Sequence, residues 1–176
     1  MHAFILAGGF ATRLWPLTEV RAKPLLPIAH VPLISTIVER IPKEIPITVS
    51  TNAAFGKDFE AWKATTRRHI TITIEDAGGE QQKLGALGAI ARWIRTEKID
   101  DDILLLAGDN YMECNIEEIR QAFRGNPLVL GYDIKSKDAA KAFGTIVLKD
   151  GVGPVHMIDS FEEKPSEPRS TIVSTG

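Results

Sequence analysis

The sequence predicts an α/β protein with a three-layer α/β/α, Rossmann-like arrangement, in which helices cover both faces of a mostly parallel sheet. Strand-like and helix-like segments alternate over residues 1–134. The composition, 44% hydrophobic and 25% charged, is that of an ordinary globular protein and gives no support to disorder or a coiled coil. We expect the 176 residues to form a single domain, with an α/β core at 1–134 and an added part at 135–176.

The expected elements follow one another in regular order. Apolar or alternating segments predict strands at 2–6, 47–50, 70–74, 103–106 and 128–134. Apolar residues at helical spacing predict helices at 32–40, 54–67, 84–95 and 116–123, the last with Asn115 as a cap. Trp62 lies on the apolar face of its helix and is better explained as core than as a stacking surface. The continuous apolar run at 103–106 is typical of a central strand covered on both faces.

The pattern changes after residue 134. Segments 144–149 and 156–162 predict two strands joined by a turn at Asp150-Gly151, a β-hairpin added to the α/β core. In open parallel sheets, ligands bind at the carboxyl ends of the strands. Three expected strands end in glycine or carboxylate residues: Gly8-Gly9, Glu75-Asp76 and Gly108-Asp109-Asn110. The sequence therefore predicts a site at this edge of the sheet.

Charge and targeting signals argue against several functional classes. The net charge of −2 offers no global positive field for nucleic acid, and Arg67-Arg68 at a helix end make no basic stripe. No apolar run approaches the ~20 residues of a membrane helix, and the first residues lack the pattern of a signal peptide. Cys114 has no partner cysteine, and the four histidines share no ligand spacing. We expect a cytoplasmic protein with no nucleic-acid and no membrane partner.

The segment after the first strand is rich in small residues. Residues 6–18 run Leu-Ala-Gly-Gly-Phe-Ala-Thr-Arg-Leu-Trp-Pro-Leu-Thr. Small residues allow a turn to expose several N–H groups to an anion, and Arg13 could supply a positive fork for a polyphosphate. The alternative is a tight turn with a solvated Arg13, since the segment is neither a Walker loop nor a dinucleotide-binding pattern. Lys23, held before a proline in apolar company, is an unusual place for a merely solvated charge.

Residues 6–18 and Lys23-Pro24 resemble the opening motif of sugar-1-phosphate nucleotidylyltransferases, Leu-Ala-Gly-Gly-x-Gly-Thr-Arg-Leu-x-Pro-Leu-Thr followed by Lys-Pro. Ala11 is the one clear departure, because the family usually has glycine there. The resemblance implies the nucleotide-diphospho-sugar transferase fold and nucleotidyl transfer from a nucleoside triphosphate to a sugar-1-phosphate. It implies Arg13 and Lys23 as catalytic residues. The nucleotide-binding residues that it implies are Leu6, Ala7, Gly8, Gly9, Ala11, Thr12, Arg13, Lys23, Glu80 and Gly85.

Two later stretches resemble the nucleotide half of the family's site in the same order. Residues 80–90 are similar to the base-recognition loop and the helix after it, in which Glu80 and the Gly85 backbone would contact the base. Residues 104–110 are similar to the strand that delivers the metal-binding aspartate, so Asp109 would hold Mg²⁺.

The end of the chain resembles the sugar-phosphate half. Residues 143–144 and 161–165 match it, which implies that sugar, hydroxyls and phosphate are contacted in turn by Gly144, Glu163 and Lys164. Gly-Asp-Asn at 108–110 is similar to the glucose-1-phosphate thymidylyltransferase branch and favours dTTP or UTP with glucose-1-phosphate. Glu80, in place of glutamine, leaves cytidine or guanosine open.

The resemblance also implies that the chain is C-terminally short, because family members continue past residue 176 with a second metal-binding aspartate. A non-catalytic nucleotide or nucleotide-sugar binding module is therefore the alternative function. A truncated sheet edge could pair with another copy, so a homo-oligomer stays open.

Overall fold

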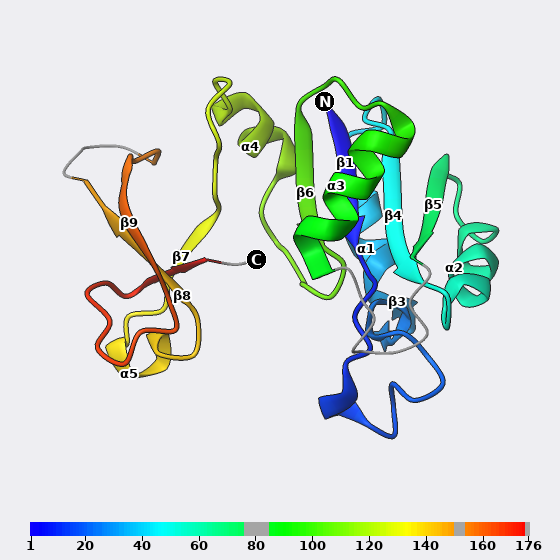
Figure 1. Ribbon diagram of the computed structural model, residues 1–176, viewed down its shortest axis with the longest axis horizontal. Helices are drawn as coiled ribbons and strands as arrows, with labels where there is room; N and C mark the ends of the chain where they lie inside the picture. Colours follow the sequence, from blue (N-terminus) through cyan, green and yellow to red (C-terminus); the bar gives the residue numbers. More distant parts are fainter. Residues whose placement is uncertain (76–84, 150–153, 175–176) are drawn as a thin grey trace. The chain divides into compact units, whose positions relative to one another are not determined.

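The computed structural model describes residues 1–75, 85–149 and 154–174 (Figure 1). The chain forms two compact units, Met1–Glu117 and Glu118–Gly176. Within the described ranges, no helix is both long and apolar enough to cross a membrane.

The first unit contains the predicted parallel sheet. Its strand order is β5-β4-β1-β6, and all three pairings are parallel. The strands are β1 (His2–Leu6), β4 (Ile47–Asn52), β5 (Ile70–Glu75) and β6 (Ile103–Ala107). The helices between them are α1 (Leu33–Arg40), α2 (Gly56–Lys63) and α3 (Gly85–Glu97). Because each crossover carries a helix, as parallel strands require, the predicted α/β class is confirmed.

Side chains of β1 alternate between the two faces of the sheet, as the period of a strand requires. Ala3 and Ile5 are fully buried in the core that α1 and α2 complete. Phe4 faces the opposite way and stacks on Trp93 of α3, with ring centroids 4.3 Å apart. Figure 1 shows α3 in front of this sheet and α1 behind it, which is the expected three-layer arrangement.

Two side chains of types that often lie on protein surfaces, Trp62 and Arg68, form hydrogen bonds within the first unit. Trp62 is 5% exposed, and its Nε1–H donates to Ser35 Oγ at 2.8 Å, so the prediction that it belongs to the core is confirmed. The Arg68 guanidinium donates to four carbonyl oxygens at and after the end of α1, where a cation complements the helix dipole. These carbonyls belong to Val38, Ile41, Pro42 and Ile45, at 2.7–3.3 Å.

Two expected strands occupy other positions in the sheets than predicted. In the described part of the chain β6 pairs only with β1, and its Leu105 is 45% exposed, so the prediction of a central strand at 103–106 is wrong. The segment expected at 128–134 forms a shorter strand, β7 (Gly131–Asp133), which pairs antiparallel with the second unit's β10 (Ile172–Ser174). An apolar run indicates a tendency to be buried, but the strand partner depends on distant residues.

The second unit is an antiparallel sheet in the order β7-β10-β8-β9. Strands β8 (Gly144–Leu148) and β9 (Ile158–Glu163) are antiparallel partners, as the predicted hairpin requires, while its turn at 150–151 lies outside the described residues. Two short helices complete the chain, α4 (Ile116–Ala122) at the junction of the units and α5 (Lys137–Ala140). The predicted cap of α4 is present, because Asn115 Oδ1 accepts from the Glu117 N–H at 3.0 Å.

Candidate functional site

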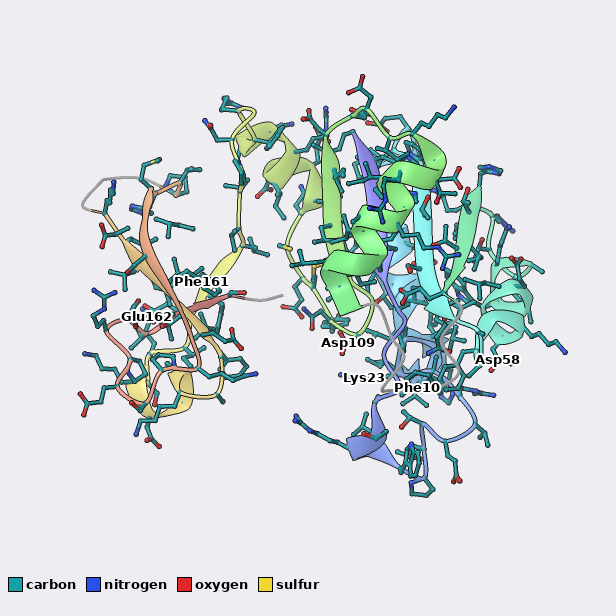
Figure 2. The ribbon with its side chains drawn as sticks, viewed as in Figure 1. Phe10, Lys23, Asp58, Asp109, Phe161 and Glu162 are labelled. Carbon is teal, nitrogen blue, oxygen red and sulfur yellow. The ribbon has the colours of Figure 1, made fainter. Side chains whose placement is uncertain are left out.

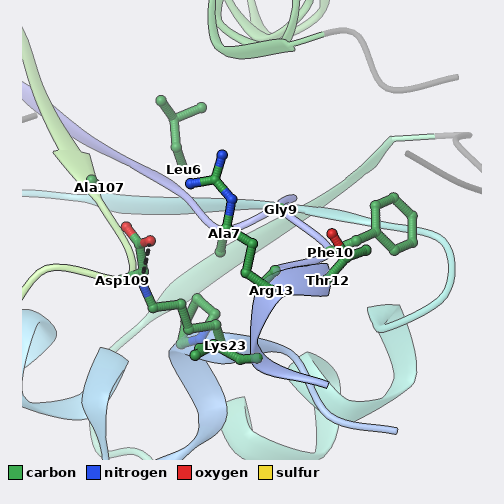
Figure 3. Close-up of a pocket in the computed structure, with 12 residues that line it drawn as sticks. Leu6, Ala7, Gly9, Phe10, Thr12, Arg13, Lys23, Ala107 and Asp109 are labelled. Atoms are coloured by element: carbon green, nitrogen blue, oxygen red, sulfur yellow. Dashed lines mark hydrogen bonds and ion pairs between the residues drawn. The ribbon is translucent and has the colours of Figure 1, made fainter. Parts of the chain in front are cut away.

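A cavity of about 630 Å³ lies at the carboxyl ends of β1 and β6 (Figure 3). The loop after β1, the Lys23-Pro24 pair and the end of β6 all contribute to its wall. It brings together eight of the residues that the sequence assigned to the nucleotide and the metal: Leu6, Ala7, Gly9, Ala11, Thr12, Arg13, Lys23 and Asp109. Glu80, assigned to the base, lies outside the described residues.

The loop after β1 is fixed by a tight turn at Ala11. This residue has the left-handed backbone (φ 48°, ψ 43°) and precedes the short 3-10 helix η1 (Thr12–Leu14). Its carbonyl accepts a hydrogen bond of 2.7 Å from the hydroxyl of Thr18, a side chain of which 1% is exposed. An L-residue with a Cβ costs about 1 kcal/mol or more in this region relative to glycine. The departure from the family motif therefore falls at the position where a glycine would be unstrained.

Asn52, which the sequence analysis did not assign, braces the other side of this loop. Asn52 ends β4 and is fully buried. Its Nδ2 donates to the Gly8 carbonyl at 3.0 Å, while its Oδ1 accepts from the Phe55 N–H at 3.2 Å. Asn52 comes two residues after the strand predicted at 47–50, and a polar residue at this strand end was the available signal. Since both ends of the amide are used, Asn52 sets where the chain leaves β1.

Lys23 and Asp109 form an ion pair across the cavity, with Lys23 Nζ 2.8 Å from Asp109 Oδ2. Figure 2 shows the two side chains pointing toward one another, and Figure 3 marks the contact. Lys23 begins a second 3-10 helix, η2 (Lys23–Leu25), whose Pro24 and Leu25 are buried and anchor the backbone. The two side chains remain 35% and 44% exposed, so both charges are reachable from solvent.

Gly108 explains how Asp109 comes so close to the first strand. The Gly108 N–H donates to the Leu6 carbonyl at 2.8 Å. A Cβ at this position would lie 2.9 Å from the same Leu6 oxygen, a separation that real Cβ atoms essentially never show. The glycine thus allows the end of β6 to approach the end of β1, and Asp109 follows directly.

The Arg13 side chain extends over the same cavity (Figure 3). It is exposed, and no described residue gives its guanidinium a hydrogen bond or an ion pair. As far as the described residues go, the Arg13 donors are thus available to a ligand, whereas the Lys23 ammonium already has a carboxylate partner.

The donor set at Asp109 bears on the predicted Mg²⁺. No group of three or more His, Cys, Asp or Glu side chains that could hold a metal occurs among the described residues. Mg²⁺ is commonly bound through one or two carboxylates together with substrate phosphates, rather than in an all-protein cage. A single exposed carboxylate beside a cavity lined by backbone and by the cationic side chains of Arg13 and Lys23 fits this mode of binding.

A second cavity of about 180 Å³ adjoins the first, since Leu6 and Gly9 line both. Its remaining lining residues are Gly8, Glu75, Gly85 and Ala86. Gly85 opens α3 with a positive φ of 70°, a conformation that glycine adopts without strain. Gly8 and Gly85, both assigned to the nucleotide, thus lie here, next to the carboxylate that ends β5.

The residues assigned to the sugar phosphate lie together in the second unit. Gly144 and Glu163 are directly opposite in the β8–β9 ladder, and a Cβ at 144 would meet the Phe161 ring at 2.7 Å. Lys164 follows with a positive φ of 44°, and its N–H donates to the Phe143 carbonyl at 3.1 Å. Lys164 Nζ lies 3.1 Å from Glu163 Oε1, and both side chains are more than 60% exposed.

Comparisons with known proteins agree with this geometry. Residues 2–176 match the family profile described as "Nucleotidyl transferase". The chain is 28% identical to a glucose-1-phosphate thymidylyltransferase of Streptomyces antibioticus, over 100% of this chain and 48% of that protein. It is 29% identical to mannose-1-phosphate guanylyltransferase 1 of Arabidopsis thaliana, over 94% of this chain and 45% of that protein. The chain thus spans less than half the length of these two relatives.

The fold is also found among solved structures. The crystal structure of an apo UDP-glucose pyrophosphorylase superposes with a TM-score of 0.80, covering 100% of this chain and 75% of that one. At 16% identity this likeness shows the fold alone.

Proposed function

Because the chain belongs to the nucleotidyl transferase family, we propose that it transfers a nucleotidyl group from a nucleoside triphosphate to a sugar-1-phosphate. The observation that carries this proposal is the cavity in which the loop after β1, Arg13, Lys23 and Asp109 meet. The cavity offers backbone amides and two cations, which suit a polyphosphate, and one carboxylate, which suits a metal bound to that polyphosphate.

The reaction requires positioning and charge neutralisation rather than a protein nucleophile. An oxygen of the sugar phosphate attacks the α-phosphorus, and the bond from that phosphorus to the bridging oxygen breaks to release pyrophosphate. The amides of residues 8–12 hold the triphosphate, and the Arg13 guanidinium stabilises the leaving pyrophosphate. Lys23 neutralises phosphate charge close to the reacting phosphorus.

Asp109 is the carboxylate that would hold Mg²⁺, which when bound neutralises phosphate charge and aligns the two substrates. The same carboxylate pairs with Lys23. Lys23 would therefore lie between the carboxylate that holds the metal and the phosphates that it neutralises.

The second unit would supply the sugar-phosphate contacts. Lys164 holds the phosphate, Glu163 accepts hydrogen bonds from sugar hydroxyls, and the Gly144 backbone borders the ring. The Lys164–Glu163 pair places one cation and one acceptor side by side, which suits a ligand carrying a phosphate and hydroxyls.

The base and the sugar are finer questions. The Gly-Asp-Asn sequence at 108–110 favours dTTP or UTP with glucose-1-phosphate. One relative is named for thymidylyl transfer to glucose-1-phosphate and the other for guanylyl transfer to mannose-1-phosphate, so both pairs of substrates belong in the test.

The test is pyrophosphate release with each common nucleoside triphosphate, Mg²⁺ and either glucose-1-phosphate or mannose-1-phosphate. We expect release that requires both substrates. A parallel thermal-shift measurement detects binding without turnover, because a ligand raises apparent stability by mass action. Binding without pyrophosphate release would identify the non-catalytic binding module. The absence of both binding and release would reject nucleotide chemistry. The cytoplasmic location and a homo-oligomer stay predictions.

A further inference from the structure

The loop at residues 164–171 leaves β9 at Lys164 and returns to the side of this strand at Arg169. Arg169 Nε donates to Glu162 Oε1 at 2.6 Å, and Arg169 Nη2 donates to Ser160 Oγ at 2.7 Å. Ser160 and Glu162 are two residues apart in β9, so their side chains lie on the same face of the strand. One guanidinium thus joins the loop to two successive positions on that face.

The Glu162 carboxylate makes this contact stronger than an ordinary surface ion pair. Its side chain is 26% exposed, and its Oε2 is buried with no hydrogen-bond partner among the described residues. A partly buried carboxylate is costly unless a cation or a donor compensates for its charge. Arg169 is the cation that pairs with Glu162. The loss of Arg169 therefore leaves this carboxylate uncompensated and favours a rearranged loop.

Lys164 shows why the path of this loop matters. Its backbone has a positive φ of 44°, which is strained for a residue with a Cβ. A strained conformation persists only where the surrounding structure holds it. The Lys164 N–H donates to the Phe143 carbonyl at 3.1 Å, which anchors the first residue of the loop. Arg169 anchors the loop again further along the chain, where it returns to β9.

The rest of the loop has little freedom between these anchors. Pro165 and Pro168 each fix a φ angle, and Pro168 is buried. The end of the loop is held by Thr171, whose hydroxyl donates to Asp133 Oδ1 at 2.6 Å. Because the segment is stiff, a change at one anchor is passed along it to the others.

We infer that Arg169 is a positioning residue for the sugar phosphate. By holding the loop on β9 it sets the backbone of Lys164, and so directs the ammonium that would bind the phosphate. Glu162 and Glu163 are successive residues of β9 and lie on opposite faces, so the contact with Arg169 is made behind the proposed sugar-binding side chain. Arg169 therefore acts through Lys164 and not by touching the ligand. This inference rests on the proposed function, because it takes Lys164 to bind the sugar phosphate.

The first measurement separates positioning from stability. Arg169→Ala should raise KM for the sugar-1-phosphate by about 5- to 10-fold, as expected when a hydrogen bond to a charged group is weakened. KM for the nucleoside triphosphate and kcat should stay almost unchanged, whereas a loss of folded protein would lower kcat and leave both KM values as they are. Arg169→Lys should recover part of the loss, because an ammonium keeps the charge without the two-pronged geometry. An unchanged KM for the sugar-1-phosphate, or an equal rise in both KM values, overturns the inference.

A double variant shows whether Arg169 acts through Lys164. Residues that act through one another have non-additive effects. In the Lys164→Ala background, Arg169→Ala should therefore raise KM for the sugar-1-phosphate no further. Additive effects overturn the inference. If Arg169→Ala does not fold, Ser160→Ala serves in both measurements, because it removes one of the two acceptors and should raise the same KM by a smaller factor.

The matched control is Lys137→Ala, which removes an exposed cation of α5 that has no ion pair among the described residues. It should leave both KM values unchanged. Calorimetric titration with glucose-1-phosphate and mannose-1-phosphate gives the same comparison as dissociation constants if the chain binds without turnover. Wild-type protein that neither binds nor converts a sugar-1-phosphate rejects the proposed function itself. Binding or turnover that Arg169→Ala leaves unchanged rejects only the role of Arg169.

Discussion

The two units hold their candidate residues by different means. In the first, the loop after β1 is fixed by buried polar groups and close backbone contacts: Asn52 binds the Gly8 carbonyl, Thr18 binds the Ala11 carbonyl, and Gly108 binds the Leu6 carbonyl. In the second, the candidate side chains of Glu163 and Lys164 are exposed and form a surface ion pair, and Lys135–Asp133 is another such pair in this unit. Exposed ion pairs contribute little stability and rearrange readily. The half proposed to bind the nucleotide is therefore preorganised, whereas the half proposed to bind the sugar phosphate has side chains that are free to change partner.

The largest expected effect is at Arg13 in the preorganised half. Arg13→Ala should lower turnover by about 10²–10³, the usual cost of losing one preorganised charge contact, and should leave Tm almost unchanged. Steady-state kinetics and thermal unfolding measure the two. Arg95→Ala removes an exposed arginine from α3 and should alter neither. Equal losses of activity and stability in Arg13→Ala would contradict a role in the reaction.

Next in size is Lys164 in the exposed half. Lys164→Ala should raise KM for the sugar-1-phosphate by about 10- to 100-fold, as expected for a hydrogen bond to a charged group. Binding of the nucleoside triphosphate should not change, and Tm should hold because the ion pair is exposed. Lys149→Ala, at the opposite end of β8, is the matched control. A loss of nucleotide affinity in Lys164→Ala would contradict the proposal that the first unit binds the nucleotide and the second unit binds the sugar phosphate.

A smaller effect, on stability, is expected at Gly108. Gly108→Ala places a Cβ 2.9 Å from the Leu6 oxygen, and overpacking of this kind costs about 1–3 kcal/mol. Gly9→Ala is the stability control, because a Cβ at Gly9 meets nothing within 4 Å. Chemical denaturation compares the two variants. Equal unfolding free energies would show that the end of β6 is not held as closely as described.

The smallest effect concerns Asp133, the last residue of β7, whose Oδ1 accepts a hydrogen bond from the hydroxyl of Thr171, just before β10. The hydrogen bond from the Lys135 side chain, and then those from Thr171 and the Lys135 N–H, lower the pKa of Asp133 from 3.8 to about 2. A carboxyl whose pKa is depressed in the folded state stabilises the fold above pH 3.8 and loses this contribution as the pH falls through about 2. Carboxyl NMR should follow this titration. An Asp133 titration near 3.8 would mean that the three contacts do not form in solution.

Local patterns predict the elements of the first unit well, because each strand and helix there has a clear apolar period. They do not predict partners: the segment at 128–134 has the pattern of a strand, yet its β7 pairs with β10, a three-residue strand after Pro168 that has too little pattern to detect. Lys23 and Asp109 were assigned from their motifs, but their ion pair required the fold, because 86 residues separate them.

Asn52 shows why the rest of the site could not be predicted from sequence. It ends a strand of the parallel sheet, where a polar residue is as often a turn former as a ligand. Its burial distinguishes it, and that burial depends on how the loop after β1 and the start of α2 pack around the same edge. By contrast Arg13 needed no such context, since its motif is local.

Arg68 has a consequence for how this protein meets charged molecules. Its guanidinium lies against the carbonyls at the end of α1 and in the turn that follows, and those dipoles partly cancel its field. A tally of cationic residues near Arg67 and His69 thus overstates the attraction that this surface exerts on a distant anion. Long-range electrostatic guidance of a polyanion falls instead to cations without such a partner, and among the described residues Arg13, which lines the cavity of about 630 Å³, is such a group.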